Sequence, residues 1–239
     1  MKVRGERECK ECGRRWSYYE TGSVACPDCE SLHSVGVGER KRHTASPVEL
    51  DLSPAREQVE TAPLEEVADV AAERCREYCR RQGFIDGGEL RTLSWTYVAA
   101  AELAAAASLV GRSLRVGDAE ELYLLSLLRG ADRGERPDAG DVPPSMRSAR
   151  GLAAADAVED YARDLRTYLD DHEDARARRV LGSIADHRRR VHALDGDVPP
   201  TTADGLVHAA RALGRYLADG EEGALAEARG HVDRLTDLD

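Results

Sequence analysis

Residues 9–30 read CKECGRRWSYYETGSVACPDCE and carry the strongest pattern in the chain. Cys9 and Cys12 form one CxxC pair, Cys26 and Cys29 form a second, and 13 residues separate the two pairs. A CxxC pair places two sulfur atoms on one tight turn, and two such turns can face each other around a tetrahedral metal ion. The spacing therefore predicts a four-sulfur metal site at the front of the chain.

The residues between the two pairs predict a short β-hairpin. Trp16, Tyr18 and Tyr19 favour a strand, the following ETGS favours a turn, and Val24 favours a return strand. A module of about 45 residues buries too little apolar surface to fold well by itself. Structural zinc contributes about 10–16 kcal/mol to such peptides, so we expect one zinc ion to stabilise this one.

The motifs CKECG and CPDC, with aromatic residues between them, resemble the zinc-ribbon family over residues 1–43. The resemblance implies a three-stranded antiparallel sheet, with residues 32–43 (LHSVGVGERKRH) supplying the last strand. It also implies a structural zinc ion held by Cys9, Cys12, Cys26 and Cys29. Glu30 departs from the family, because the second knuckle often ends in glycine.

Three related ribbons set limits on this resemblance. Rubredoxins have similar knuckles and bind iron, but their knuckles lie much further apart. The ribbon of the hydrogenase nickel-insertion accessory protein begins Met-His with the histidine as nickel ligand, whereas this chain begins Met1-Lys2. Ribbons of transcription-initiation factor B precede cyclin-like repeats, which are not recognisable here. Because a ribbon leaves no open coordination position, we expect a structural rather than a catalytic zinc ion.

The composition is acidic and poor in lysine. The formal net charge is −11, and Lys2, Lys10 and Lys41 are the only lysines. An acidic, alanine-rich chain of this kind resembles cytoplasmic proteins of halophilic microbes; a GC-rich genome would explain the arginine and alanine but not the acid excess. The first 20 residues lack the apolar core of a secretory signal, and the longest apolar stretch, 96–111, contains Glu102 and is too short to span a bilayer. We expect a soluble, cytoplasmic protein without a membrane partner.

Positive charge is concentrated at the front. Residues 1–46 carry 9 Lys/Arg and 7 Asp/Glu, and the remaining residues carry 25 and 38. The body would repel a phosphate backbone, so we expect any contact with nucleic acid to involve the front end. A basic surface with interleaved aromatic rings could stack on bases or bind an acidic protein surface. The candidate partner-binding residues are Arg14, Arg15, Trp16, Tyr18, Arg40, Lys41 and Arg42.

The rest of the chain predicts an all-α domain. Residues 44–61 are predicted to be a linker with a short helical turn after Ser53-Pro54, and residues 62–239 a helical bundle or a short array of helical hairpins. No strand is predicted after residue 43. Helices are expected from Pro63 to Gly83, over 89–110, from an Asp118 N-cap with Glu121 in a capping box, and over 145–170, 172–194, 202–219 and 221–237. The fold class is therefore mainly α with an N-terminal β ribbon.

Two further patterns have ordinary interpretations. Cys75 and Cys79 lie four residues apart on the apolar face of a predicted helix, which indicates core packing rather than ligation. GDVPP occurs at 140–144 and at 196–200, each time before a predicted helix. This indicates either a duplicated helical hairpin or two similar helix starts, because Asp and Pro are common there.

The sequence shows no catalytic constellation, with neither a Gly-rich phosphate loop nor a Ser–His–Asp order. We therefore expect no catalytic residues and no enzyme activity. The first hypothesis is an interaction protein whose ribbon docks an unknown protein partner, with the helical body as scaffold. The alternative is a transcription-related regulator that contacts DNA or RNA through the ribbon.

Overall fold

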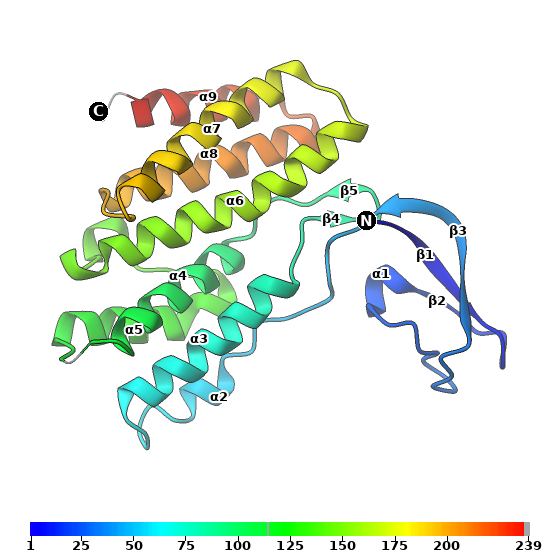
Figure 1. Ribbon diagram of the computed structural model, residues 1–239, viewed down its shortest axis with the longest axis horizontal. Helices are drawn as coiled ribbons and strands as arrows, with labels where there is room; N and C mark the ends of the chain where they lie inside the picture. Colours follow the sequence, from blue (N-terminus) through cyan, green and yellow to red (C-terminus); the bar gives the residue numbers. More distant parts are fainter. Residues whose placement is uncertain (114, 237–239) are drawn as a thin grey trace.

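The computed structural model describes residues 1–113 and 115–236. A small N-terminal β module stands beside a larger, layered helical body (Figure 1). The described chain is mainly helical, with its main sheet at the N-terminus, as the sequence predicts. Within these residues, no helix has both the length and the apolar content to cross a bilayer.

Three antiparallel strands form the ribbon sheet in the order β2-β1-β3: β1 (Lys2–Cys9), β2 (Arg15–Ser17) and β3 (Ser34–Arg42). The strand expected over 32–43 is confirmed as β3. The central strand β1 was not predicted, because its charged residues hide the alternation that marks a strand. It precedes the first knuckle and pairs with both other strands.

The expected hairpin between the two knuckles is wrong beyond Ser17. Tyr18 and Tyr19 begin a short helix, α1 (Tyr18–Thr21), instead of extending a strand. The Ser17 hydroxyl accepts a hydrogen bond from the backbone N–H of Glu20, and Gly22 ends the turn with a φ of +62°. Local capping therefore overrides the strand preference of the aromatic residues.

Residues 44–61 pack along the helical body. The turn expected after Ser53-Pro54 is present as α2 (Ser53–Arg56). Leu52 and Ala55 are fully buried in the core of the helical body. The Arg56 guanidinium donates to both carboxylate oxygens of Asp132, at 2.8 and 2.6 Å. The domain boundaries at residues 43 and 61 stay predictions, but this segment contributes side chains to the body's core.

The first half of the body contains α3 (Leu64–Arg81), α4 (Trp95–Val110) and α5 (Asp118–Gly130). Helix α4 packs against α3, α5 and α6 (Arg147–Asp171). Its alanines allow close approach of the neighbouring helices, and most of its residues are buried. The cap predicted for α5 is wrong, because Gly117 is the N-cap and makes no side-chain capping bond. Asp118 lies in the first turn, where its charge still favours the helix dipole.

The helix expected from residue 89 begins at Trp95. A two-stranded hairpin, β4 (Ile85–Asp86) and β5 (Glu89–Leu90), precedes it, although no strand was predicted after residue 43. Gly87 and Gly88 form its turn with φ angles of +59° and +95°, which glycine adopts readily. The Ser94 hydroxyl then accepts a hydrogen bond from the Tyr97 backbone N–H and caps α4.

The second half of the body consists of two consecutive helical hairpins. Helix α6 pairs with α7 (Ala175–Ala193), and α8 (Pro200–Asp219) pairs with α9 (Glu222–Thr236). Three 3₁₀ turns precede them: η1 (Ala131–Arg133), η2 (Ala139–Asp141) and η3 (Pro144–Met146). Because α6 contacts both α4 and α8, it joins the two halves. Residue 237 of the predicted 221–237 helix lies outside the described residues.

Candidate metal centre

The two knuckles bring the four ribbon cysteines together. Their sulfur atoms all lie within 4.8 Å of one another. The separations are 3.6 Å for Cys9–Cys29, 3.5 Å for Cys12–Cys26 and 3.6 Å for Cys12–Cys29. All four are free thiols, since a disulfide would need about 2.05 Å. The sequence prediction of a four-cysteine cluster is confirmed.

The spacing of the sulfur atoms suits a tetrahedral metal ion. A Zn–S length of about 2.3 Å corresponds to sulfur–sulfur separations of about 3.8 Å at the corners of a tetrahedron. The observed sulfur–sulfur separations of 3.5–3.6 Å are slightly shorter than this value. Cys9 and Cys26 are buried while Cys12 and Cys29 are exposed, so one side of the cluster faces the ribbon core.

The titration of the thiols favours a cation at their centre. Hydrogen bonds from the backbone N–H groups of Cys12 and Glu11 lower the pKa of Cys9 to about 7, against the effect of burial. At Cys29 the backbone N–H of Ser31 lowers the pKa, but the neighbouring Cys12 and Cys9 thiols and burial outweigh it and raise the pKa to about 12. Four thiols this close cannot all ionise by themselves, and a divalent cation supplies the charge that lets them do so.

Backbone geometry is similar at the two knuckles. The Gly13 backbone N–H donates to the Cys9 carbonyl at 3.1 Å, and that of Glu30 donates to the Cys26 carbonyl at 2.9 Å. Gly13 has a φ of +76° and Glu30 a φ of +58°. Glu30, noted above as a departure from the ribbon pattern, therefore adopts the left-handed conformation that glycine adopts more easily.

The ribbon has its own small core beside the metal site. Trp16 is buried with Cys9 and Cys26, and its indole N–H donates to the Ser23 carbonyl at 3.1 Å. Tyr18 is partly buried and packs edge-on against His43, with ring centroids 6.0 Å apart. Both rings, proposed above as partner-binding residues, therefore contribute to packing.

The basic candidate residues lie at opposite ends of the sheet. Arg14 and Arg15 are exposed near the metal site, where they pair with Asp28 and Glu8. At the other end, β1 begins opposite the end of β3, where Arg40, Lys41 and Arg42 are located. Lys2, opposite Arg42, lies six positions before Glu8, which is opposite Arg15, and this corresponds to about 20 Å along the strand. The candidate set thus divides into two surfaces rather than one.

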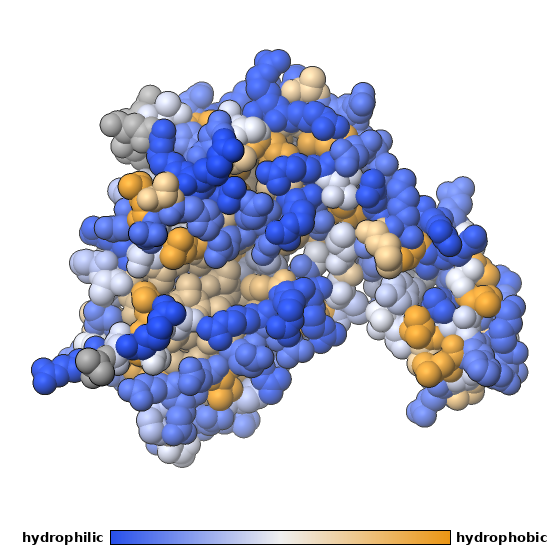
Figure 2. Space-filling view, viewed as in Figure 1, coloured by the Kyte–Doolittle hydropathy of each residue, from blue (hydrophilic) through white to orange (hydrophobic). Residues whose placement is uncertain are grey.

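An apolar patch at the metal end was not predicted. Val24, Leu32 and Val35 are 43%, 70% and 39% exposed, large values for such side chains. They surround Ser34, whose hydroxyl donates to the Val24 carbonyl at 2.6 Å and whose backbone N–H donates to the Leu32 carbonyl at 2.9 Å. Figure 2 shows hydrophobic colour at this far end of the ribbon. We call these three residues the apolar tip.

The other two cysteines belong to the body. Cys75 is buried in α3, and Cys79 is half-buried one turn later. Burial raises the pKa of Cys75, and burial together with the Asp160 carboxylate raises that of Cys79 to about 12. Both stay protonated thiols near neutral pH, which agrees with packing rather than ligation.

A buried ionic network in the body was also not predicted. Glu102, fully buried in α4, accepts hydrogen bonds from Arg150 at 2.9 Å and Arg136 at 2.6 Å. Arg150 and Arg136 also contact Asp204, and the Tyr123 hydroxyl donates to Glu102. The two guanidinium groups and two carboxylates neutralise one another, so we interpret the network as structural.

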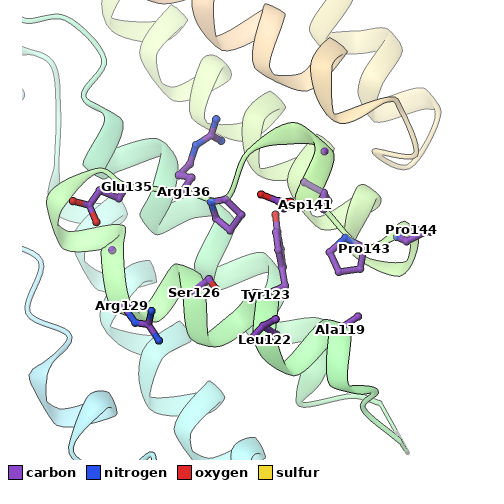
Figure 3. A pocket seen from close by; sticks show the side chains of 14 residues that line it. Ala119, Leu122, Tyr123, Ser126, Arg129, Glu135, Arg136, Asp141, Pro143 and Pro144 are labelled. Carbon is purple, nitrogen blue, oxygen red and sulfur yellow. The ribbon is translucent and has the colours of Figure 1, made fainter.

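The network borders a pocket of about 680 Å³ between α5 and the loop before α6. Figure 3 shows Leu122 and Tyr123 on α5, with Pro143 and Asp141 on the opposite wall. The wall groups Tyr123 and Arg136 already bond to the network.

Comparison with known proteins places the chain in a family without giving it an activity. No curated protein and no solved structure matches the chain. A family model matches residues 1–232, which covers both the ribbon and nearly all of the helical body. The chain therefore belongs to the family of unknown function DUF7117.

Proposed function

We propose that the four cysteines hold one structural zinc ion and that the ribbon is a docking module for a protein partner, with the helical body as its scaffold. The four-sulfur geometry supports zinc, because zinc accepts tetrahedral thiolate ligation without a geometric preference of its own. The closed ligand set leaves no position for substrate, which supports a binding role rather than a catalytic one.

The apolar tip is the observation that carries the docking proposal. Three of the seven exposed large hydrophobic residues in the described chain lie here, whereas Val59, Leu122 and Leu194 are scattered over the body and Met1 lies at the other end of the ribbon. The tip lies beside the second knuckle, at the end of the ribbon farthest from the helices (Figure 1). Clustered apolar side chains in a charged surround are typical of protein interaction sites.

The charges around the tip indicate the character of the partner. Arg15, Glu8 and Val35 are directly opposite one another on β2, β1 and β3, so their side chains share one face of the sheet. The nearby arginines already pair with Glu8 and Asp28. The positive charges at this end of the ribbon are therefore already neutralised and do not form a basic surface for a phosphate backbone. It suits an apolar protein segment flanked by polar groups of both signs.

The test compares two leucines of equal exposure. Leu32 at the tip and Leu122 on α5 are 70% and 68% exposed. Immobilised wild-type protein, Leu32→Ser and Leu122→Ser would be used to capture partners from native lysate in molar salt. We expect Leu32→Ser to reduce recovery of the captured protein roughly ten-fold, because truncating an interface anchor costs more than about 1 kcal/mol. Leu122→Ser should not reduce it.

Both variants should keep their zinc content and melting temperature, since the mutated side chains are exposed. Capture that survives molar salt indicates an apolar contact. Loss of capture with Leu122→Ser alone would place docking on the body. Capture that disappears with nuclease or with rising salt would instead favour the nucleic-acid function.

A further inference from the structure

The end of the ribbon nearest the body is strongly basic. Five cations lie in the body-side half of β1 and β3, against one acid, Glu39. The cations are Lys2, Arg4, Arg40, Lys41 and Arg42. Since the chain as a whole has a net charge of −11, this concentration is contrary to its general composition. We call this region the junction.

Like charges face each other across the junction. Lys2 is directly opposite Arg42, and Arg4 is directly opposite Arg40. Directly opposed like charges destabilise an antiparallel pair. Asp171, at the end of α6, accepts contacts from Lys2 at 3.3 Å and from Arg42 at 3.0 Å. Among the described residues, no carboxylate pairs with Arg40 or Lys41. Arg40 therefore faces a like charge without a carboxylate partner, an arrangement that folding alone does not favour, and Lys41, opposite Val3, has no carboxylate partner either.

These cations line a pocket. A cavity of about 400 Å³ lies between the end of β3, the turn of the β4–β5 hairpin and the end of α6. Lys2, Arg40, Lys41 and Arg42 line it, with Glu89 and Asp171 as its acids. Gly87 and Gly88, at the turn of the hairpin, also line it. A volume of this size is in the range of small-ligand sites.

An aromatic stack forms the wall on the α6 side. Tyr168 and His172 both line the pocket, and their rings are stacked with centroids 4.0 Å apart and an interplanar angle of 12°. His172 is exposed and Tyr168 is half-buried. A flat ring pair beside several cations is the combination that binds a nucleobase and its phosphates. One arginine side chain can donate two parallel hydrogen bonds to the oxygens of a phosphate group.

We propose that the junction pocket binds a phosphorylated nucleoside. Arg40 and Lys41 contact the phosphates, while Lys2 and Arg42, held by Asp171, complete the positive wall. The base packs on the Tyr168–His172 stack. The ligand is either a free nucleotide or a nucleotide unit of a single strand, since both present the same phosphate and ring. This site is separate from the docking tip and does not depend on it.

Calorimetric titration of the full-length, zinc-loaded protein tests this proposal. The probes are ATP, tripolyphosphate, a twelve-residue oligothymidylate and poly-glutamate, in the lowest KCl concentration that preserves the circular dichroism of the fold. We expect ATP to bind at least about five-fold more tightly than tripolyphosphate, because base stacking adds affinity. The relative affinities of ATP and oligothymidylate identify the source of the ligand. Poly-glutamate should bind weakly.

Two variants make the test specific. Arg40→Glu should weaken ATP binding about ten-fold, because a charged hydrogen bond is lost. Its melting temperature should hold or rise, since the new carboxylate faces Arg4. The double variant Tyr168→Leu, His172→Ala should reduce ATP affinity to that of tripolyphosphate. Arg229→Glu, on an exposed position of α9, makes the same charge change away from the pocket and should bind normally.

Three results would overturn the proposal. The first is the absence of ATP and oligothymidylate binding to the folded wild-type protein. The second is equal loss of binding in Arg40→Glu and Arg229→Glu, which would show an effect of net charge alone. The third is equal affinity for poly-glutamate and ATP, which would indicate an acidic protein surface as the ligand.

Discussion

At the scale of single residues, the two knuckles form the same kind of turn with different amino acids. Both CxxC pairs are followed by a residue with positive φ, Gly13 at +76° and Glu30 at +58°. Glycine adopts this conformation freely, whereas another residue is destabilised there by about 1–2 kcal/mol. The second knuckle is therefore less stable with Glu30 than it would be with glycine at this position.

Glu30→Gly should stabilise the ribbon. Relief of the left-handed strain is partly offset by the greater chain entropy of glycine, about 0.5–1 kcal/mol. The expected net gain is about 0.5–1 kcal/mol. The measurement is thermal unfolding followed by zinc release to a chromogenic chelator. Glu20→Gly, inside α1, is the matched control and should release zinc at a lower temperature. Earlier release from Glu30→Gly would show that the glutamate side chain supports the site.

Residue roles were predictable where they are encoded locally. The four cysteines can be identified as a cluster from the sequence, because the two CxxC spacings are enough to define it. Glu30 could be noticed as a departure from the ribbon pattern, but its φ could not. Arg136 could not be found at all: it lies in a polar loop, and its partners Glu102 and Asp204 are 34 and 68 residues away. The apolar tip was equally hidden, since Val24 and Leu32 look like ordinary strand residues.

At the scale of elements, the sequence predicts the long periodic helices correctly. It fails for strand β1, for the short β4–β5 hairpin and for the short capped helix α1. Helices α3, α6 and α8 follow from apolar spacing alone. Strand β1 was missed because charges cover it, and the β4–β5 hairpin because its strands have two residues each. In α1 a single Ser17 cap outweighs the preference of two tyrosines. The Ser-Pro steps of residues 44–61 predict a linker and do not reveal that Leu52 is buried.

Leu52→Ala should therefore destabilise the helical body strongly. Truncating a fully buried leucine costs about 2–5 kcal/mol, since the cavity left behind adds to the lost transfer energy. Urea unfolding followed by circular dichroism measures the change. Leu122→Ala, at an exposed position, should change stability by no more than about 0.5 kcal/mol. A cost for Leu52→Ala as small as that of the control would mean that residues 44–61 are a free linker.

At the scale of the whole molecule, the ribbon is a bipolar element on an acidic body. Its metal end carries the apolar tip and paired charges, and its body end carries the basic junction. The two ends lie about 20 Å apart along β1, so the two proposed ligands would not compete for one surface. Both surfaces depend on the fold of the ribbon sheet. Among the described residues no disulfide joins the two knuckles, and the four-cysteine cluster is the one group that could link them, through a metal ion.

The zinc site is thus the central claim, and X-ray absorption at the zinc edge of the purified full-length protein tests it most directly. We predict about one zinc ion per chain, surrounded by four sulfur atoms at about 2.3 Å. Cys75→Ser should leave the spectrum unchanged, because that thiol is buried in the body. A shell containing nitrogen or oxygen, iron in place of zinc, or a ribbon that stays folded without metal would contradict the account.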